Sequence, residues 1–106
     1  VMVVPFEHKA HLEEFSAETL ADLMVTTQKA LKVLQAAYNP NGFNIGINLG
    51  KSAGAGIADH LHQHVVPRWS GATNFLSVVG ETRTIPEWID QTYLHLRNIW
   101  NTLYPE

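Results

Sequence analysis

The 106-residue chain contains no cysteine. Disulfide bonds, thiolate nucleophiles and thiolate metal ligands are therefore excluded. Proteins without disulfides are typical of reducing compartments, so we expect a cytoplasmic location.

Long apolar runs and an excess of positive charge are also lacking. No apolar run approaches the roughly 20 residues of a membrane span, and the 7 basic residues are outnumbered by 10 acidic ones, which gives a formal net charge of −3. Nucleic-acid binding usually needs a broad basic surface. We therefore expect neither a membrane nor a nucleic acid as partner, and any polyanion must be bound locally.

The length suits one domain, which we assign to residues 1–106. The segment Val1–Pro5 has the β-branched composition of a strand, with no turn or cap before it. We expect that N-terminal elements of the same domain are missing from this sequence.

One segment has the spacing of a long amphipathic helix. Its apolar residues recur every three or four positions from Ser16 to about Tyr38, which places them on one helical face. Ser16 is a suitable N-cap, and Glu18 suits the first turn. We expect this face to cover the core with Leu20, Leu23, Met24, Leu31, Leu34 and Ala37.

A second helix is predicted near the end of the sequence. Thr84 and Glu87 stand three residues apart, as in a capping box, and Pro86 suits a first helical turn. The apolar residues with helical spacing, which we interpret as packing residues, are Ile85, Trp88, Ile89, Leu96, Ile99, Trp100 and Leu103.

Residues 43–49 alternate between large apolar and small or polar side chains, which indicates a strand with two different faces. The apolar face carries Phe43, Ile45, Ile47 and Leu49. The other face carries Asn44, Gly46 and Asn48, as a ligand-side face would. A further short strand is predicted over 75–79. Strands joined by short loops favour an antiparallel sheet with helices against it, the α+β class.

The most unusual stretch has histidine at every second position, at His60, His62 and His64. Residues two apart in an extended strand project from the same face, with Cα atoms about 6.6 Å apart. A helix would direct the same side chains around its axis. The pattern therefore predicts a strand with three imidazoles on one side.

Three interpretations of this row remain open. The row can be structural, with no chemistry. It can hold a metal, because imidazole is a common ligand. A flat strand spreads the three rings too widely for one ion unless it bends, but two of them together with His8 or His11 can form a site. It can also supply a nucleophile, since an imidazole nitrogen can attack phosphorus and later leave. In that case the other nitrogen of the central ring, His62, must be held as N–H by an acceptor.

A glycine-rich loop, residues 50–56, precedes the histidine strand. Glycine allows main-chain N–H groups to converge on an anion, although the order of a Walker loop is absent.

The run His60-x-His62-x-His64-Val65-Val66 resembles the motif of the histidine triad superfamily. The resemblance extends from Val1 to about residue 75, and the wider string from Gly54 to Trp69 is most similar to the diadenosine polyphosphate phosphorylase or hydrolase branch. It implies an α+β fold with an antiparallel sheet, a long helix on it and a C-terminal helix.

The resemblance also implies roles for individual residues. His62 would be the nucleophile that forms a covalent nucleotidyl intermediate, with its second nitrogen held by the main-chain carbonyl of His60. His60 and His64 would contact phosphate or brace the site. The substrate-binding residues implied by the match are His8, Asn48, Ser52, Gly54, Ala55 and Gly56.

Two positions depart from the family pattern. Gln63 stands where an apolar residue is usual, which we interpret as a mark of the phosphorylase-like branch. Gly56 stands where many hydrolases carry a glutamine that positions water, which favours inorganic phosphate as acceptor.

The resemblance implies a nucleotide or dinucleoside polyphosphate substrate, a homodimer and no required cofactor, with a divalent metal as an alternative. Other functions that stay open are a phosphoramidase or general nucleotide hydrolase, a metal-dependent hydrolase, and a nucleotide-binding module without catalysis.

Overall fold

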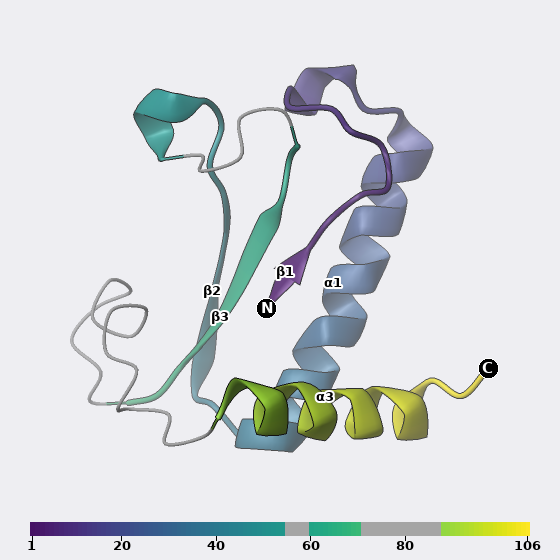
Figure 1. Ribbon diagram of the computed structural model, residues 1–106, viewed down its shortest axis with the longest axis vertical. Helices are drawn as coiled ribbons and strands as arrows, with labels where there is room; N and C mark the ends of the chain where they lie inside the picture. Colours follow the sequence, from purple (N-terminus) through teal and green to yellow (C-terminus); the bar gives the residue numbers. More distant parts are fainter. Residues whose placement is uncertain (55–59, 71–87) are drawn as a thin grey trace.

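The computed structural model describes residues 1–54, 60–70 and 88–106. Within these ranges the sheet has three strands, β1 (Met2–Val3), β2 (Gly42–Ile47) and β3 (Gln63–Arg68). The helices are α1 (Ala17–Tyr38) and α3 (Ile89–Leu103), with 3-10 turns η1 (Leu12–Glu14) and η2 (Lys51–Ala53). Figure 1 shows α1 beside the sheet and α3 across the lower end of α1.

The sheet is antiparallel, with β3 in the centre and strand order β1-β3-β2. Val65 of β3 lies opposite Ile45 of β2, and His64 lies between Met2 on one side and Gly46 on the other. Because directly opposite residues project from the same face, this register fixes which side chains accompany the histidines. The predicted α+β class with an antiparallel sheet is confirmed.

Helix α1 begins as predicted. The Ser16 hydroxyl accepts a hydrogen bond from the Thr19 N–H at 3.1 Å, which satisfies a donor that the first turn leaves without a partner. The helix ends where Asn39 takes a left-handed conformation, with φ of 46°, and its N–H bonds the Gln35 carbonyl.

The buried face of α1 agrees with the predicted one only at Leu23 and Leu34, while Leu20, Leu31 and Ala37 are half-buried. Met24 is 52% exposed, so its assignment to the core was wrong, and Thr27 is buried instead. The other buried residues of α1 are Leu23, Ala30, Val33 and Leu34. The reason is the direction of packing. The helix presents the row through Leu23, Thr27 and Ala30 to the sheet, and Met24 lies one position around the axis from that row.

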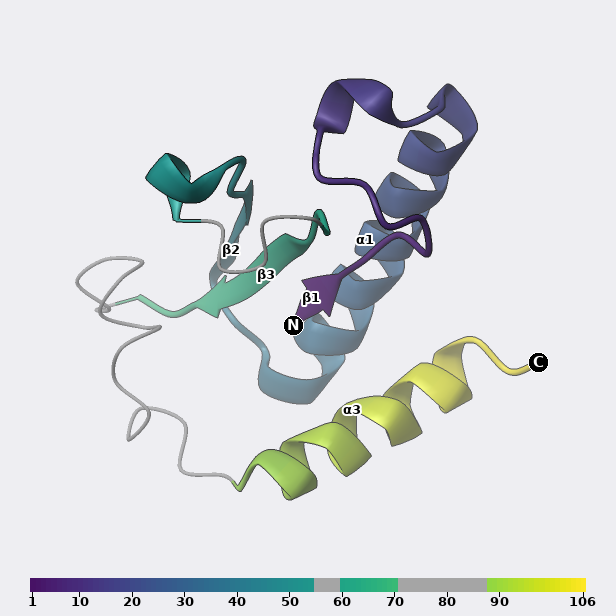
Figure 2. The same cartoon turned by 45° about the horizontal axis from the view of Figure 1, so that its top comes forward.

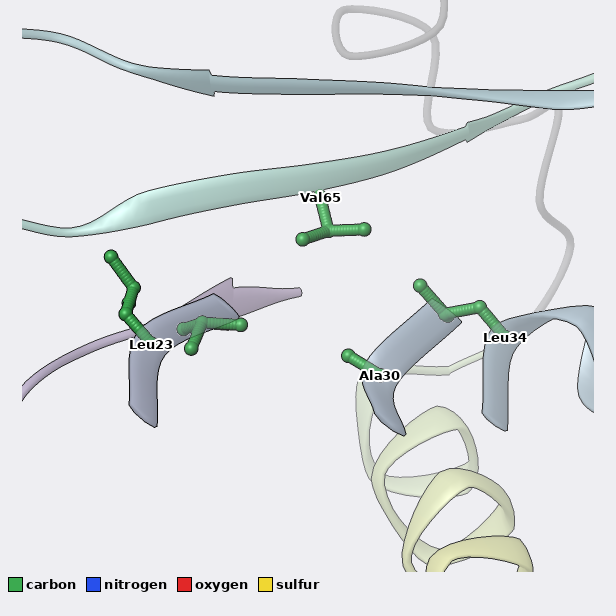
Figure 3. Packing of buried hydrophobic residues seen from close by; sticks show 5 residues of the cluster. Leu23, Ala30, Leu34 and Val65 are labelled. Carbon is green, nitrogen blue, oxygen red and sulfur yellow. The ribbon is translucent and has the colours of Figure 1, made fainter. Parts of the chain in front are cut away.

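The core lies between α1 and the two strands β1 and β3. Its cluster consists of Val3, Leu23, Ala30, Leu34 and Val65. Figure 3 shows Val65 pointing from β3 toward the face of α1 that carries Leu23, Ala30 and Leu34. Val65 is fully buried.

Strand β2 is an edge strand, and its apolar face is only partly covered. Ile45 is 47% exposed, and Leu49 lies beyond the end of the strand. Figure 2 shows α1 beside β1, with β3 next and β2 farthest from the helix. The side chains of β2 therefore alternate between the two faces as predicted, but the apolar ones are not all buried.

Helix α3 begins at Ile89, later than predicted. Trp88 is extended and takes the N-cap position. Trp88, Ile89 and Leu103 are all exposed, so their assignment to the packed face of the helix was wrong. The predicted capping box over residues 84–87 and the predicted strand over 75–79 lie outside the described residues. Leu96, Ile99 and Trp100 are half-buried, and Leu96 packs against the core cluster.

Neither helix in the described part of the chain combines the length and the apolar character that crossing a membrane requires.

Candidate functional site

The three histidines follow one extended segment, but only His64 belongs to β3. His60 and His62 lie before the strand, in residues 60–62, which we call the lead-in. The predicted strand was therefore too long at its start. The reason lies in the partner strand. Strand β2 pairs no further than Ile47, which stands opposite Gln63, and the ladder stops there.

The histidine face of the sheet is the face that the alternation assigned to a ligand. His64 lies opposite Gly46. A Cβ added at Gly46 would have no other atom within 4 Å. Asn44 lies opposite Val66, two positions beyond His64. The small residue beside His64 therefore leaves open space along the row.

His62 is held by the main chain of the segment that carries it. Its Nδ1 lies 3.1 Å from the carbonyl oxygen of His60. A carbonyl can only accept, so in the neutral ring Nδ1 carries the proton and donates it. The Nε2 atom then keeps its lone pair. This contact is the one that the family resemblance implied for a nucleophilic ring.

His64 is the nearest ring to His62. The two ring centroids are 5.0 Å apart and the planes meet edge to face at 77°. Burial lowers the pKa of His64, and positive charge on His62 lowers it further. A ring with a lowered pKa is mostly neutral near pH 7. The pair therefore avoids holding two positive charges side by side.

His60 faces the loop after β1. Its Nε2 lies 2.9 Å from the Pro5 carbonyl oxygen and donates to it, and its ring lies against His8 with centroids 4.3 Å apart. The main chain follows the same course, since the Leu61 N–H donates to the Lys9 carbonyl at 2.8 Å. His60 and His8 thus fasten the lead-in to the Pro5–Lys9 loop. Four histidines therefore form a row of contacts. The His8 ring packs on the His60 ring, the His60 carbonyl bonds the His62 ring, and the His62 ring packs on the His64 ring.

The remaining predicted residues lie around the turn after β2. Asn48 comes one residue after the end of β2. Gly54 has a left-handed φ of 91°, and a Cβ there would lie 3.8 Å from the Asn48 amide nitrogen, so the loop returns toward Asn48. Ser52 is exposed in η2. Ala55 and Gly56, on which the interpretation of the acceptor depends, lie outside the described residues.

Sequence reasoning missed two contributors. The Pro5 carbonyl cannot be predicted from residue type, because it is a main-chain group brought near by folding. Thr27 is a polar residue on the buried face of α1, and it bonds Gln63 of β3 at 2.6 Å. The signal for this pair was Gln63 itself, a polar residue at a position where strand alternation places the core.

No group of three or more metal-ligating side chains (His, Cys, Asp or Glu) in the described ranges is arranged to hold a metal ion.

Comparison with known proteins gives concordant results. The family model of the HIT domain matches residues 1–71. A protein of Mycobacterium tuberculosis (strain CDC 1551 / Oshkosh) named AP-4-A phosphorylase is 44% identical over 100 residues, which cover 94% of this chain and 51% of that protein. Adenosine 5'-monophosphoramidase hnt1 of Schizosaccharomyces pombe is 34% identical over 67 residues, or 63% of this chain and 47% of that protein. The chain thus spans about half the length of these relatives.

Among solved structures, a zinc-bound histidine triad family protein from Mycobacterium smegmatis is similar over 96% of this chain and 68% of that chain. The TM-score is 0.71 and the sequences are 29% identical.

Proposed function

Because this chain belongs to the HIT domain family, we propose that it cleaves dinucleoside polyphosphates at an α-phosphate, with His62 as covalent nucleophile. The observation that carries the proposal is the contact between His62 Nδ1 and the His60 carbonyl oxygen. It fixes the tautomer in which Nε2 has a free electron pair, and a nucleophile needs that pair.

The first step is an in-line displacement at phosphorus. Nε2 of His62 forms a bond to the α-phosphorus, and the bond from that phosphorus to the bridging oxygen breaks. The leaving group is the rest of the molecule, a nucleoside polyphosphate with its new terminal oxygen. The His62 ring becomes positively charged, and the Nδ1 hydrogen bond to the His60 carbonyl becomes stronger as it does so.

The second step regenerates the ring. An oxygen of inorganic phosphate or of water attacks the same phosphorus and gives up its proton to solvent, the bond to Nε2 breaks, and the electron pair returns to nitrogen. Because Nδ1 keeps its proton, the ring departs as neutral imidazole, a good leaving group, and division of one displacement into two lowers each barrier. The AP-4-A phosphorylase relative favours phosphate as acceptor.

His64 and His60 have supporting roles in this proposal. His64 is the adjacent ring on the same face, so its neutral ring donates an N–H hydrogen bond to phosphate oxygens. His60 braces the lead-in through Pro5 and His8. Asn48, Ser52 and Gly54 bind the phosphate chain from the turn after β2, and the family resemblance assigns the same role to Ala55 and Gly56.

The products of diadenosine tetraphosphate (Ap4A) test the reaction. With inorganic phosphate as acceptor the chain yields ADP and ATP, whereas with water it yields AMP and ATP. Incubation with and without ¹⁸O-labelled phosphate, followed by mass spectrometry, separates the two. We expect label in the terminal phosphate of ADP. AMP alone would establish hydrolysis, and unconsumed substrate in both incubations would contradict the proposal.

A second candidate activity is hydrolysis of nucleoside phosphoramidates. The observation that favours it is the match to the fission yeast phosphoramidase, and the same histidine attack applies with an amine as leaving group. Adenosine 5'-monophosphoramidate, offered beside diadenosine tetraphosphate at equal concentration, separates the two. We expect faster turnover of the dinucleotide, because the relative with the higher identity carries that substrate in its name.

A metal-dependent reaction is tested separately, because a solved relative is described as zinc-bound. We propose a reaction that needs no metal. Turnover should survive treatment with a chelator. Loss of turnover on chelation and its return with zinc would replace the histidine nucleophile with a metal-dependent mechanism.

We also propose that the chain pairs with a second copy of itself. Helix α1 exposes apolar side chains on its outer side, with Met24 52% and Val25 49% exposed, and such residues are common at interfaces between subunits. Light scattering after size exclusion should give twice the chain mass, and Met24→Lys should reduce it. A monomer at every concentration would contradict this.

A further inference from the structure

Gln63 occupies the buried face of β3, between the two histidines nearest the proposed chemistry. It is 2% exposed, and it and Val65 are the most deeply buried large side chains in the described residues. His62 and His64 precede and follow it in sequence, so their side chains leave the opposite face. A polar side chain at such a depth must find partners, because an unpaired amide in the core is costly.

The partner of Gln63 is the Thr27 hydroxyl on α1, and a second hydrogen bond fixes the orientation of that hydroxyl. The Gln63 side-chain nitrogen donates to Thr27 Oγ1 at 2.6 Å, and Thr27 Oγ1 lies 2.7 Å from the Leu23 carbonyl oxygen. The carbonyl can only accept, so the Thr27 proton points to it and the hydroxyl accepts from Gln63. Figure 3 shows that Leu23 lies on the side of α1 that faces the sheet.

This chain of bonds constrains the strand more narrowly than an apolar contact does. Apolar side chains tolerate small shifts along a helix, because dispersion has no direction. A hydrogen bond loses strength when its angle and length change. The Gln63–Thr27 bond therefore limits both sliding of β3 along α1 and rotation of the strand about its axis.

Rotation of the strand matters because His62 and His64 project from the opposite side of the same main chain. We propose that Gln63 is a positioning residue, which acts through its bond to Thr27 to set the directions of the His62 and His64 rings. This inference rests on the proposed function of His62. An error of about 1 Å in the position of a nucleophile can cost up to about a hundredfold in rate.

The first test replaces Gln63 with leucine, which has a similar volume and no polar atom. In Gln63→Leu the Thr27 hydroxyl keeps its bond to the Leu23 carbonyl, so no buried donor loses its partner. We expect the midpoint of thermal unfolding to stay within about 5 °C of the parent. We expect kcat to fall about ten- to a hundredfold, with KM nearly unchanged.

Replacement of the partner has the reverse effect on stability. In Thr27→Val the Gln63 amide is left buried without its acceptor, and we expect the unfolding midpoint to fall by about 5–15 °C. The double variant removes both polar groups and should recover most of that midpoint while kcat stays low. Thr27→Ser keeps the hydroxyl and is the matched control, with kcat close to the parent value.

The ring nitrogens of His62 and His64 provide a measurement that is independent of turnover. In ¹⁵N NMR spectra the parent should show one His62 tautomer with a protonated Nδ1, and Gln63→Leu should show exchange broadening or mixed tautomers. A kcat equal to that of the parent in Gln63→Leu, with unchanged ring signals, would overturn the inference. If the parent does not consume the dinucleotide, the proposed function fails, and the ring signals still decide the role of Gln63.

Discussion

The two faces of β3 and its lead-in differ in how completely their side chains are fixed. On the face toward α1, Leu61, Gln63 and Val65 are each no more than 3% exposed. On the other face His62 and His64 are half-buried, and the contact that orients His62 comes from one main-chain carbonyl.

This difference shows how a short segment can serve packing and chemistry at once. Alternation along an extended chain separates the two tasks by face, because neighbouring residues project in opposite directions. The buried face sets the position of the main chain, and the half-open face keeps ring atoms within reach of a substrate. Substitutions on the two faces should therefore separate loss of activity from loss of stability.

The largest effect is expected for the central histidine. His62→Asn removes the nucleophilic nitrogen from a half-buried position, so turnover should fall by at least roughly a thousandfold while the unfolding midpoint changes little. Steady-state assays and calorimetry on the same preparation measure both. The control is His11→Asn, at an exposed histidine of the same chain. Retention of turnover in His62→Asn would contradict the assignment of the chemistry to the histidine face.

Next in size is the loss of a fully buried side chain from the other face. Val65→Ala deletes two methyl groups from the core cluster, which should lower the free energy of unfolding by about 2 kcal/mol. Urea denaturation measures it. Val66→Ala, a half-buried change on the histidine face, is the matched control and should cost clearly less. Equal losses from the two variants would mean that the faces do not differ in packing.

A smaller effect is expected at the start of α1, which supports the buried face from a distance. Ser16→Ala removes the acceptor for the Thr19 N–H and should lower the free energy of unfolding by about 1 kcal/mol. Turnover by the folded protein should not change. Ser16→Asp restores an N-cap acceptor and should recover the stability. A drop in kcat without a drop in stability would contradict this assignment.

The smallest effect concerns pH and the half-buried face. The pKa of His64 is lowered from its ordinary value of 6.5, first by burial and then by nearby positive charge. His64 therefore takes up a proton at a higher pH in the unfolded chain than in the folded chain. The free energy of unfolding should decline as the pH falls below 6.5 toward the lowered pKa. His64→Gln should weaken this decline relative to the parent in pH-dependent thermal unfolding. Identical pH profiles would show that His64 does not contribute.

Local patterns in the sequence predicted much of this arrangement. The helix from Ser16 to Tyr38 and the alternation over residues 43–49 follow from spacing, which is a local property. The placement of His62 and His64 on one face follows from the period of an extended chain.

Features that depend on distant parts of the chain were not predictable. The start of β3 at Gln63 depends on where β2 ends, and the exposure of Met24 depends on which side of α1 meets the sheet. The contact of His60 with Pro5 joins residues 55 positions apart. The partner of Gln63 is 36 positions away, so its polarity was visible in the sequence while its role was not.

The most direct test of the account is to trap the covalent intermediate. The chain is mixed with diadenosine tetraphosphate in the absence of inorganic phosphate, quenched within milliseconds under alkaline denaturing conditions that preserve phosphohistidine bonds, and digested for mass spectrometry. We predict one adenylyl group on the peptide that carries His62, attached to the Nε2 nitrogen, and none in His62→Asn. Turnover with no adduct, or an adduct on a different residue, would contradict the account.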